Sequence, residues 1–315
     1  MNLTPTVARR FQANPAQFLE QEIKEFVRTD PGNRLPFLDD YVMWSEPLVR
    51  FADGDDPLFT QYKTIIAPTH LTPREALAQA YDKSLDEVQG RLAVISWILP
   101  AAEETRKSNR AERDVPSRLW SHTRWYGEEF NEKLREYVVE LLTEMGHMAV
   151  APFLQPYFKV FANENGPYSN WSERHAAYVA GHGTFSLSDG FITEAGIAHR
   201  VGNVVTDLEL PASPRTATGP YSNCLFDVGV NCRACIIRCP ADAISEKGHD
   251  KIKCQQYLND IGYSSEALKA GYVNETSVAG CGLCQTKVPC EFQNPITKLK
   301  RKKRWQGIQV IPHKA

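Results

Sequence analysis

Eight cysteines carry most of the chemistry that this sequence offers, and all of them lie between Cys224 and Cys290. Two close pairs, Cys232 with Cys235 and Cys281 with Cys284, have two residues between their members. This spacing lets one turn of backbone present two thiolates to a single metal centre. Clustered cysteines form disulfides, bind zinc or bind iron–sulfur clusters, and their number alone leaves all three open.

The order of the cysteines favours iron–sulfur clusters. The run CxxCxxxCP, from Cys232 to Pro240, follows the second half of the bacterial ferredoxin pattern, in which the cysteine before proline ligates the other of two clusters. Eight thiolates are also the number that two four-iron clusters need. Two zinc sites are the main alternative, because two CxxC pairs are present. Disulfides fit poorly with a cytoplasmic protein, whose thiols stay reduced.

The ferredoxin pattern also predicts which cysteines share a cluster. In that pattern the early cysteines of one motif join the last cysteine of the other. The first cluster is assigned Cys224, Cys232, Cys235 and Cys290. The second cluster is assigned Cys239, Cys254, Cys281 and Cys284. Neighbouring clusters built in this way can exchange electrons.

Charge and hydropathy exclude some classes of function. The net charge of −2 gives no general reason to expect binding to nucleic acid or to an anionic membrane. No apolar run reaches the roughly 18 residues of a membrane span, and the N-terminus has no apolar stretch of signal-peptide type. We therefore expect a cytoplasmic protein. The basic tail after the cysteines, residues 298–304, is either a solvated terminus or a contact for an acidic partner or nucleic acid.

Several helices and strands that must position the cysteines can be predicted from local signals. Asn14-Pro15 begins a helix, and residues 72–75 form a capping box that begins another. Residues 91–99 are apolar and β-branched, which predicts a buried strand. Residues 128–145 form an amphipathic helix, and residues 148–152 a short strand. The order strand, helix, strand suggests an α/β core.

Other stretches carry weaker signals. Residues 34–70 show no clear period and form either a surface wrap with aromatic anchors or a pocket wall. Residues 101–125 are polar, which favours a loop or an irregular helix. Asn170 is placed to cap a short helix that ends at Gly181. The stretch that follows, up to a strand at 201–208, is dense in Gly, Ser and Thr; it either approaches a ligand closely or forms tight turns.

The motifs together resemble the epoxyqueuosine reductase family and the related catalytic domains of reductive dehalogenases. The resemblance runs over roughly residues 90–295 and rests on ERHAAYVAGHGTFSLSDGFIT, VGNVVTDLEL, the CxxCxxxCP run, the lone Cys254 and CGLCQ. It implies an α+β fold, with a nitroreductase-like, cobalamin-binding α/β core and a C-terminal ferredoxin-like two-[4Fe–4S] module. The implied division is a helical and irregular segment at 1–90, the core at 91–215, the module at 216–297 and the basic tail at 298–315.

The resemblance implies that the small-residue segment holds a base-off cobalamin beside one cluster. The residues that it assigns to the cofactor are Glu173, Arg174, Gly181, His182, Gly183, Ser186, Thr193, Arg200, Gly202 and Thr206. A flavin is the alternative cofactor, because the group is related to nitroreductases. Tyr168 and His182 are the candidate catalytic proton donors, since dehalogenases are thought to use a tyrosine; the alternative for each is a structural role.

Some positions depart from the family pattern. The epoxyqueuosine reductases have a catalytic aspartate six residues before the Glu-Arg pair, and Pro167 stands at that place here. Cys224 also lies farther from Cys232 than the pattern has it.

From these observations we expect a cobalamin- and iron–sulfur-dependent reductase. It would take electrons from an external donor of ferredoxin or flavodoxin type, pass them through both clusters to cobalt, and cleave a small organic substrate reductively. One alternative is an electron-transfer or corrinoid-handling protein without a substrate of its own. Another is an epoxyqueuosine reductase that acts on tRNA.

Overall fold

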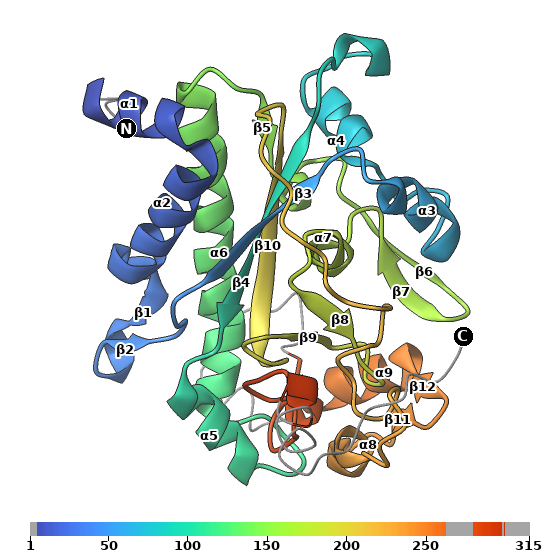
Figure 1. Ribbon diagram of the computed structural model, residues 1–315. Helices are drawn as coiled ribbons and strands as arrows, with labels where there is room; N and C mark the ends of the chain where they lie inside the picture. The colour runs from blue at the N-terminus through green and yellow to red at the C-terminus, as the bar shows by residue number, and fades with distance from the viewer. Residues whose placement is uncertain (1–4, 263–279, 298, 300–315) are drawn as a thin grey trace, which may run out of the picture.

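The computed structural model describes residues 5–262, 280–297 and 299, which combine helices with a central sheet (Figure 1). The sheet has four strands in the order β3-β4-β10-β5. Strand β4 (Ala93–Pro100) pairs along its whole length with β10 (His199–Thr206). On either side lie β3 (Leu48–Asp53) and β5 (Ala149–Val150), and every neighbouring pair is antiparallel.

Helices cover both faces of this sheet, so the central strands are apolar on both sides. Along β4, Ile95 and Trp97 pack against α2 (Pro15–Thr29) and α6 (Arg118–Glu144). Val94 points the other way, toward α3 (Pro57–Ile65), α4 (Pro73–Ala80) and α7 (Glu173–Val179). This alternation follows from the two-residue period of a strand. It explains why β4 is buried at every position except its last.

The remaining elements connect and extend these layers. The N-terminal ones are α1 (Pro5–Ala13), η1 (Pro31–Asn33), β1 (Arg34–Leu35), η2 (Pro36–Leu38), β2 (Tyr41–Val42) and η3 (Leu85–Glu87). The middle ones are α5 (Glu103–Ala111), η4 (Pro152–Leu154), the hairpin β6 (Val160–Asn163) with β7 (Gly166–Ser169), and the hairpin β8 (Gly183–Phe185) with β9 (Phe191–Thr193).

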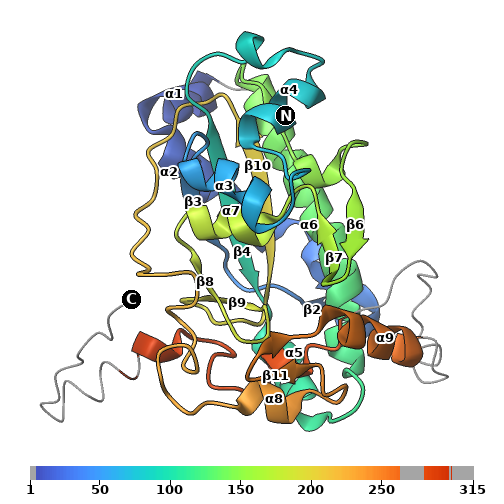
Figure 2. The same cartoon turned by 90° about the vertical axis from the view of Figure 1, so that its right-hand side faces the viewer.

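The cysteine-bearing segment gathers at one end of the sheet, where β4 ends and β10 begins, as both views show (Figures 1 and 2). Its elements are α8 (Ala234–Arg238), β11 (Ile244–Ser245), β12 (Gly248–His249), α9 (Lys251–Gly262) and η5 (Leu283–Gln285). The β8–β9 hairpin supplies Leu187 from its loop and Ile192 from β9, and Ile197 follows it, to the apolar cluster that this segment packs into.

The local signals predicted several elements well. Asn14 caps α2 through its side chain, and Thr72 with Glu75 forms the capping box of α4. The strands predicted at 91–99 and 201–208 are β4 and β10, and the strand at 148–152 is the shorter β5. Gly146 follows the end of α6 with φ of 88°, a conformation that favours glycine.

Three predictions were wrong in part. Residues 101–125 contain two regular helices joined by a short connection: α5 spans Glu103–Ala111, and α6, capped by Ser117, begins at Arg118, ten residues before its predicted start. Residues 34–70 contain β3 and α3. Asn170 does not cap α7; it closes the open end of the β6–β7 hairpin by accepting from Lys159 N at 2.8 Å and donating to Tyr157 O at 2.8 Å.

The topology of the core also differs from the predicted strand-helix-strand arrangement. Strands β4 and β5, on either side of α6, do run parallel, but β10 lies between them and is antiparallel to both. The sheet also includes β3, from the first 90 residues. Strand order depends on contacts between distant segments, which the strand-helix-strand pattern does not encode.

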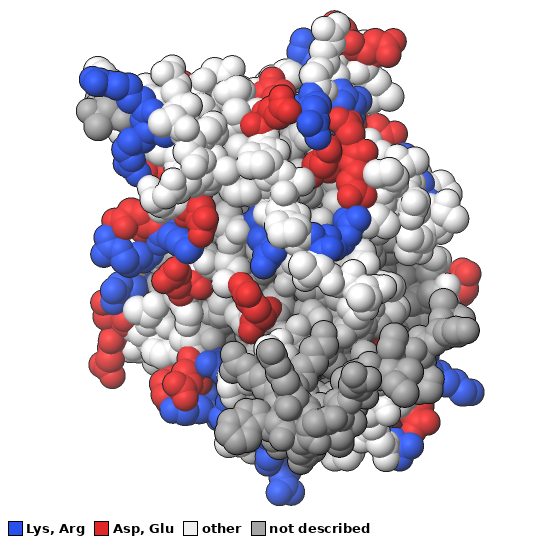
Figure 3. Space-filling model, in the orientation of Figure 1, with Lys and Arg blue, Asp and Glu red and all other residues white. Residues whose placement is uncertain are grey.

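The surface mixes both signs of charge. Figure 3 shows Lys and Arg interspersed with Asp and Glu over the described part of the face seen in Figure 1. Among the described helices, none is long and apolar enough to cross a membrane. The basic residues predicted as a tail, Lys298 and residues 300–304, lie outside the described residues.

Candidate cluster sites and an adjoining cavity

All eight cysteines are free thiols, and the fold brings them together as two groups of four. The first group lines one small cavity of about 20 Å³, and its members are Cys224, Cys232, Cys235 and Cys290. Burial, and then the neighbouring thiols of Cys224 and Cys232, raise the pKa of Cys235 to about 11. Burial and the other three thiols of the group raise the pKa of Cys290 as well.

The second group contains Cys239, Cys254, Cys281 and Cys284. Burial, and then the thiols of Cys281 and Cys239, raise the pKa of Cys254 to about 11. Burial and the other three members of the group raise the pKa of Cys284 as well. Cys235 of the first group makes a smaller contribution in the same direction. The two groups are therefore neighbours.

The thiol groups suit thiolate-bound clusters in number and environment. Metal binding requires deprotonated thiols, and a cationic centre lowers the pKa values that burial and crowding raise. Ala243 N donates to Cys239 Sγ at 3.4 Å, a contact of the kind that tunes cluster potentials. In the described residues, no three His, Cys, Asp or Glu side chains are close enough to share a single metal ion.

Helix α5 anchors the loop that carries the last three cysteines. Asn109 Nδ2 donates to Cys281 O and to Thr286 Oγ1, both at 3.1 Å. The buried carboxylate of Glu291 accepts two hydrogen bonds from Arg110 Nε, at 2.9 and 2.8 Å, and one from Lys287 N at 2.7 Å. The loop is thus fixed to the helical layer by charged and amide contacts.

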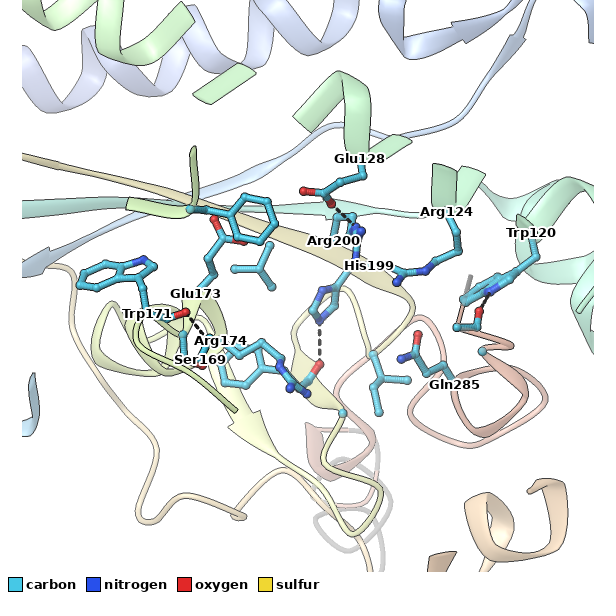
Figure 4. A pocket seen from close by; sticks show the side chains of 18 of the residues that line it. Trp120, Arg124, Glu128, Ser169, Trp171, Glu173, Arg174, His199, Arg200 and Gln285 are labelled. Carbon is cyan, nitrogen blue, oxygen red and sulfur yellow. Dashed lines mark hydrogen bonds and ion pairs between the residues drawn. The ribbon is translucent and has the colours of Figure 1, made fainter. Parts of the chain in front are cut away.

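A larger cavity of about 420 Å³ lies beside the second thiol group (Figure 4). Its walls come from α6, from the start of α7, from the start of β10 and from the loop 280–285. Trp120 Nε1 of α6 donates to Gly280 O at 3.0 Å. Gly282, with φ of 62°, lies so close to the Trp120 ring that an added Cβ would be 2.0 Å from it. The residues around Cys281 are therefore part of the cavity wall.

One side of the cavity holds a network of buried charges. Arg135 donates to Glu173 through two nitrogens, at 2.9 and 2.8 Å, and to Glu128 at 2.9 Å. Arg200 pairs with the second oxygen of Glu128. Burial opposes the charge on Glu128, but Arg200 and Arg135 outweigh it and lower its pKa. For Glu173 the effect of burial is larger than the opposing effect of Arg135, so the pKa of Glu173 is raised.

Two further arginines point into the cavity in Figure 4. Arg174 is exposed and donates to the backbone carbonyl of Asp189. Arg124 is half-buried, and burial, followed by the like charge of Arg200, lowers its pKa to about 9. At neutral pH the guanidinium of Arg124 is still charged, and no carboxylate of the described residues forms an ion pair with it.

Three of the ten residues assigned to the cofactor line this cavity: Glu173, Arg174 and Arg200. The other seven lie outside its wall. Ser186 Oγ donates to Gly190 O at 2.9 Å, Thr193 Oγ1 to Gly196 O at 3.0 Å and Thr206 Oγ1 to Met148 O at 2.8 Å. These hydroxyls support turns and the sheet edge.

The glycines of the segment serve close packing of backbone and side chains. Gly181 packs against Pro214, Gly183 against Ile192 of β9, and Gly202 against the indole of Trp97. At each, an added Cβ would come within 3 Å of a neighbouring atom. The roles proposed for these residues toward a cofactor stay predictions.

The two candidate catalytic residues also lie outside the cavity wall. His182 is buried and contacts Ser96 O through Nε2 at 3.0 Å, and burial lowers its pKa to about 3, so the ring is neutral. Tyr168, on β7, stacks on Phe161 with 5.4 Å between ring centroids. Its neighbour Ser169 does line the cavity.

Sequence reasoning missed the contribution of α6. Trp120, Arg124 and Glu128 recur every four residues, so they share one face of the helix, and all three line the cavity. That spacing is visible in the sequence, but Trp120 and Arg124 lie in the stretch predicted as a loop or an irregular helix, and only Glu128 lies in the predicted amphipathic helix.

Comparisons with known proteins give a distant similarity only. The sequence matches no protein-family model and no curated protein. Among solved structures, epoxyqueuosine reductase from Bacillus subtilis is similar at 14% identity with a TM-score of 0.42, covering 88% of this chain and 66% of that one. A selenomethionine-labelled epoxyqueuosine reductase is similar at 14% identity with a TM-score of 0.45, covering 95% and 68%.

Both neighbours are epoxyqueuosine reductases, a family that the sequence motifs also resemble. The chain spans about two thirds of their length. TM-scores this low do not establish a shared fold, so the function of the chain must be inferred from its own residues.

Proposed function

We propose that the protein is an iron–sulfur reductase, which passes electrons through two [4Fe–4S] clusters to a redox-active acceptor in the 420 Å³ cavity. One observation carries the proposal: the loop that bears Cys281 and Cys284 also forms a wall of that cavity, through Gly280, Gly282 and Gln285. An acceptor bound there is adjacent to the second group of thiols, and the second group is adjacent to the first.

Each group of residues has a defined part in this proposal. Cys224, Cys232, Cys235 and Cys290 hold the first cluster; Cys239, Cys254, Cys281 and Cys284 hold the second. When bound, the clusters supply single electrons. Trp120 closes the wall between the second group and α6, which keeps water from that side. The ion pairs of Arg135 and Arg200 fix Glu128 and Glu173 in place at the opposite wall.

Cobalamin is the acceptor that the sequence motifs favour, with a flavin as the alternative. Three residues of the proposed cofactor set, Glu173, Arg174 and Arg200, face the cavity. Its volume suits a drug-sized ligand, and a complete corrinoid is larger than that class. The described residues therefore fit only a portion of a cobalamin. In this proposal the core at 91–215 is nitroreductase-like and the segment at 216–297 is a ferredoxin-like module.

Anaerobic reconstitution tests the electron path. Protein loaded with iron and sulfide should hold about eight irons per chain and show the absorption and EPR signals of reduced four-iron clusters. Protein reduced with dithionite and then separated from the excess reductant should change the spectrum of added hydroxocobalamin or flavin, because the clusters are then the electron source. Iron binding with no spectral change on either acceptor would remove the cofactor proposal and leave the clusters.

A second candidate is an electron-transfer or corrinoid-reducing protein without a substrate of its own. The observation in its favour is that Glu128 and Glu173, the carboxyl groups of the described cavity wall, are both engaged by arginines and are poorly placed to donate a proton. Reduction of free cobalamin at the same rate with and without small organic halides or epoxides would support it. Substrate-dependent reoxidation of the clusters would exclude it.

A further inference from the structure

Positive charge exceeds negative charge at the end of the cavity between α6, α7 and β10. Four guanidinium groups meet there, those of Arg124, Arg135, Arg174 and Arg200. Among the described residues, only two carboxylates form ion pairs with them: Glu128 with Arg135 and Arg200, and Glu173 with Arg135. Two arginines are left for a ligand.

Neither of these two arginines forms an ion pair with a carboxylate of the described residues, although Glu128 acts on Arg124 and Asp189 on Arg174 at longer range. Arg174 donates to the carbonyl oxygen of Asp189, which is neutral, while the carboxylate of Asp189 contacts His249 at 3.2 Å. Arg124 makes no hydrogen bond or ion pair within the part of the chain that the structure describes, and its Nη2 would lie 3.8 Å from a Cβ added to Gly280. In Figure 4 both side chains point toward the middle of the cavity, near His199.

Leaving a charge unpaired among protein atoms is unfavourable, because such charges are normally paired or hydrogen-bonded. Arg124 is therefore a site where an anion gains a strong, charge-assisted contact. His199 does not compete for it. Burial lowers the pKa of His199 to about 4, so the ring is neutral, and its Nε2 contacts Phe191 O at 2.7 Å.

Aromatic side chains form a large part of the rest of the cavity wall, beside small, aliphatic and polar residues. The side chains that supply this surface are Trp120, Phe153, Phe158, Trp171 and Phe191. A cavity of about 420 Å³ that combines aromatic side chains with convergent polar groups can hold a small molecule. An aromatic or otherwise flat apolar body matches these walls, since aromatic rings stack against one another.

We propose that this cavity binds a small aromatic or apolar acid, with a carboxylate or phosphate group held by Arg124 and Arg174 and the body held by the aromatic wall. The identification of this acid as the substrate rests on the proposed reductase function, whereas the binding of the anion does not. The guanidinium fork of arginine matches both carboxylate and phosphate oxygens.

Calorimetry on the anaerobically reconstituted protein tests the site. Benzoate and phenyl phosphate serve as probes, benzamide as the neutral analogue of benzoate, and inorganic phosphate as the anion without a ring. We expect benzoate or phenyl phosphate to bind at least 10-fold more tightly than benzamide. Arg124→Gln and Arg174→Gln should each raise the Kd by about 10-fold or more, since a hydrogen bond to a charged group is lost.

Arg91→Gln is the matched control, because Arg91 is an exposed arginine paired with Asp53 on the surface. It should leave the Kd unchanged. Iron content and circular dichroism check that each variant is folded. If Arg124→Gln loses iron, the affinity of Arg174→Gln alone tests the proposal, because the Arg174 side chain is exposed. Benzamide binding as tightly as benzoate, or unchanged affinity in Arg174→Gln, overturns the proposal.

The readouts also separate this site from the reductase proposal. Anion binding that depends on Arg124 and Arg174, in a protein that reduces neither cobalamin nor flavin, supports the anion site and removes the reductase. Electron transfer to an acceptor, in a protein that shows no preference for anions, supports the reductase and removes the anion site. Tighter binding of phenyl phosphate than of benzoate assigns the site to phosphate esters, and the opposite order assigns it to carboxylates.

Discussion

At the scale of single residues, the cysteines and the buried charges have the most specific roles. The thiols form two groups of four, and the members of each group come from both ends of the segment: Cys290 joins Cys224, and Cys239 joins Cys281. Glu291, next to Cys290, ties the cysteine loop to α5 through Arg110 and Arg106.

The grouping of the thiols predicts the phenotype of serine variants. Cys235→Ser and Cys290→Ser should lose the same cluster, although these residues are far apart in sequence. Cys239→Ser and Cys284→Ser should lose the other one. Iron content should fall from about eight to about four per chain in each variant, because four thiolates hold each four-iron cluster. EPR of the reduced protein should give one spectrum for the first pair and a different one for the second; spectra that pair Cys235→Ser with Cys239→Ser would contradict the grouping.

Replacement of Glu291 should destabilise the cysteine loop. In Glu291→Gln the guanidinium of Arg110 loses its charge partner, and Lys287 N loses a charged acceptor. We expect a loss of about 2 kcal/mol in the free energy of unfolding, measured by denaturant titration of the reconstituted protein. Glu46→Gln, which removes an exposed partner of Lys24, is the control and should have no measurable effect. Equal stability of the two variants would show that the Glu291 contacts contribute little.

At the scale of elements, α6 connects the sheet, the charge network and the cysteine loop. Its first turns carry Trp120 and Arg124 to the loop, and its middle carries Glu128 and Arg135 to α7 and β10. The close approach of α6 to the loop depends on Gly282, whose backbone conformation and lack of a side chain both matter.

Gly282→Ala should therefore separate the loop from α6. Its Cβ would overlap the Trp120 ring, so the loop must shift, and the second cluster should be lost or become labile while the first is retained. Iron release to a chelator, followed over time, measures this. Gly90→Ala is a close control: Gly90 also has a positive φ, of 75°, but nothing lies within 4 Å of an added Cβ. Similar iron release from both variants would show that the overlap with the Trp120 ring does not cause the loss of iron.

At the scale of the whole molecule, the fold buries several neutral histidines around α7 and β10. Burial lowers the pKa of His70 to about 4, of His175 to about 3 and of His182 to about 3. An unfolded histidine has a pKa near 6.5, so between about pH 4 and pH 6.5 the unfolded chain binds more protons than the folded one. Stability is then fully present above about pH 6.5 and decreases as the pH falls.

The pH dependence of unfolding should reflect this. Each such histidine contributes a slope of up to about 1.4 kcal/mol per pH unit within that window. We expect the free energy of unfolding to fall steadily from pH 7 to pH 5, measured by denaturant titration at each pH. His182→Gln should reduce the slope, whatever its effect on stability at pH 7. A slope that is the same in the variant and the parent would show that His182 does not titrate differently on folding.

The sequence by itself determined the features that depend on near neighbours in the chain. The CxxC spacing and the proline after Cys239 predict clusters because ligands within one turn share a metal centre. The caps at Asn14 and Thr72 predict helix starts because a side chain closes onto the next turn of backbone. The strand at 91–99 was visible because both of its faces are apolar.

Only the tertiary structure decided which residues surround the cavity. Arg124 and Arg174 lie 50 positions apart in the sequence, and neither a local period nor a motif brings them together. They meet because α6 and α7 both pack against β10, each from its own face of the sheet. For the small-residue segment, in contrast, the sequence left a cofactor cradle and tight turns open; in the structure its glycines pack closely against neighbouring atoms, and its role toward a cofactor stays a prediction. Long-range packing selects between these two uses of small residues, because local sequence favours both.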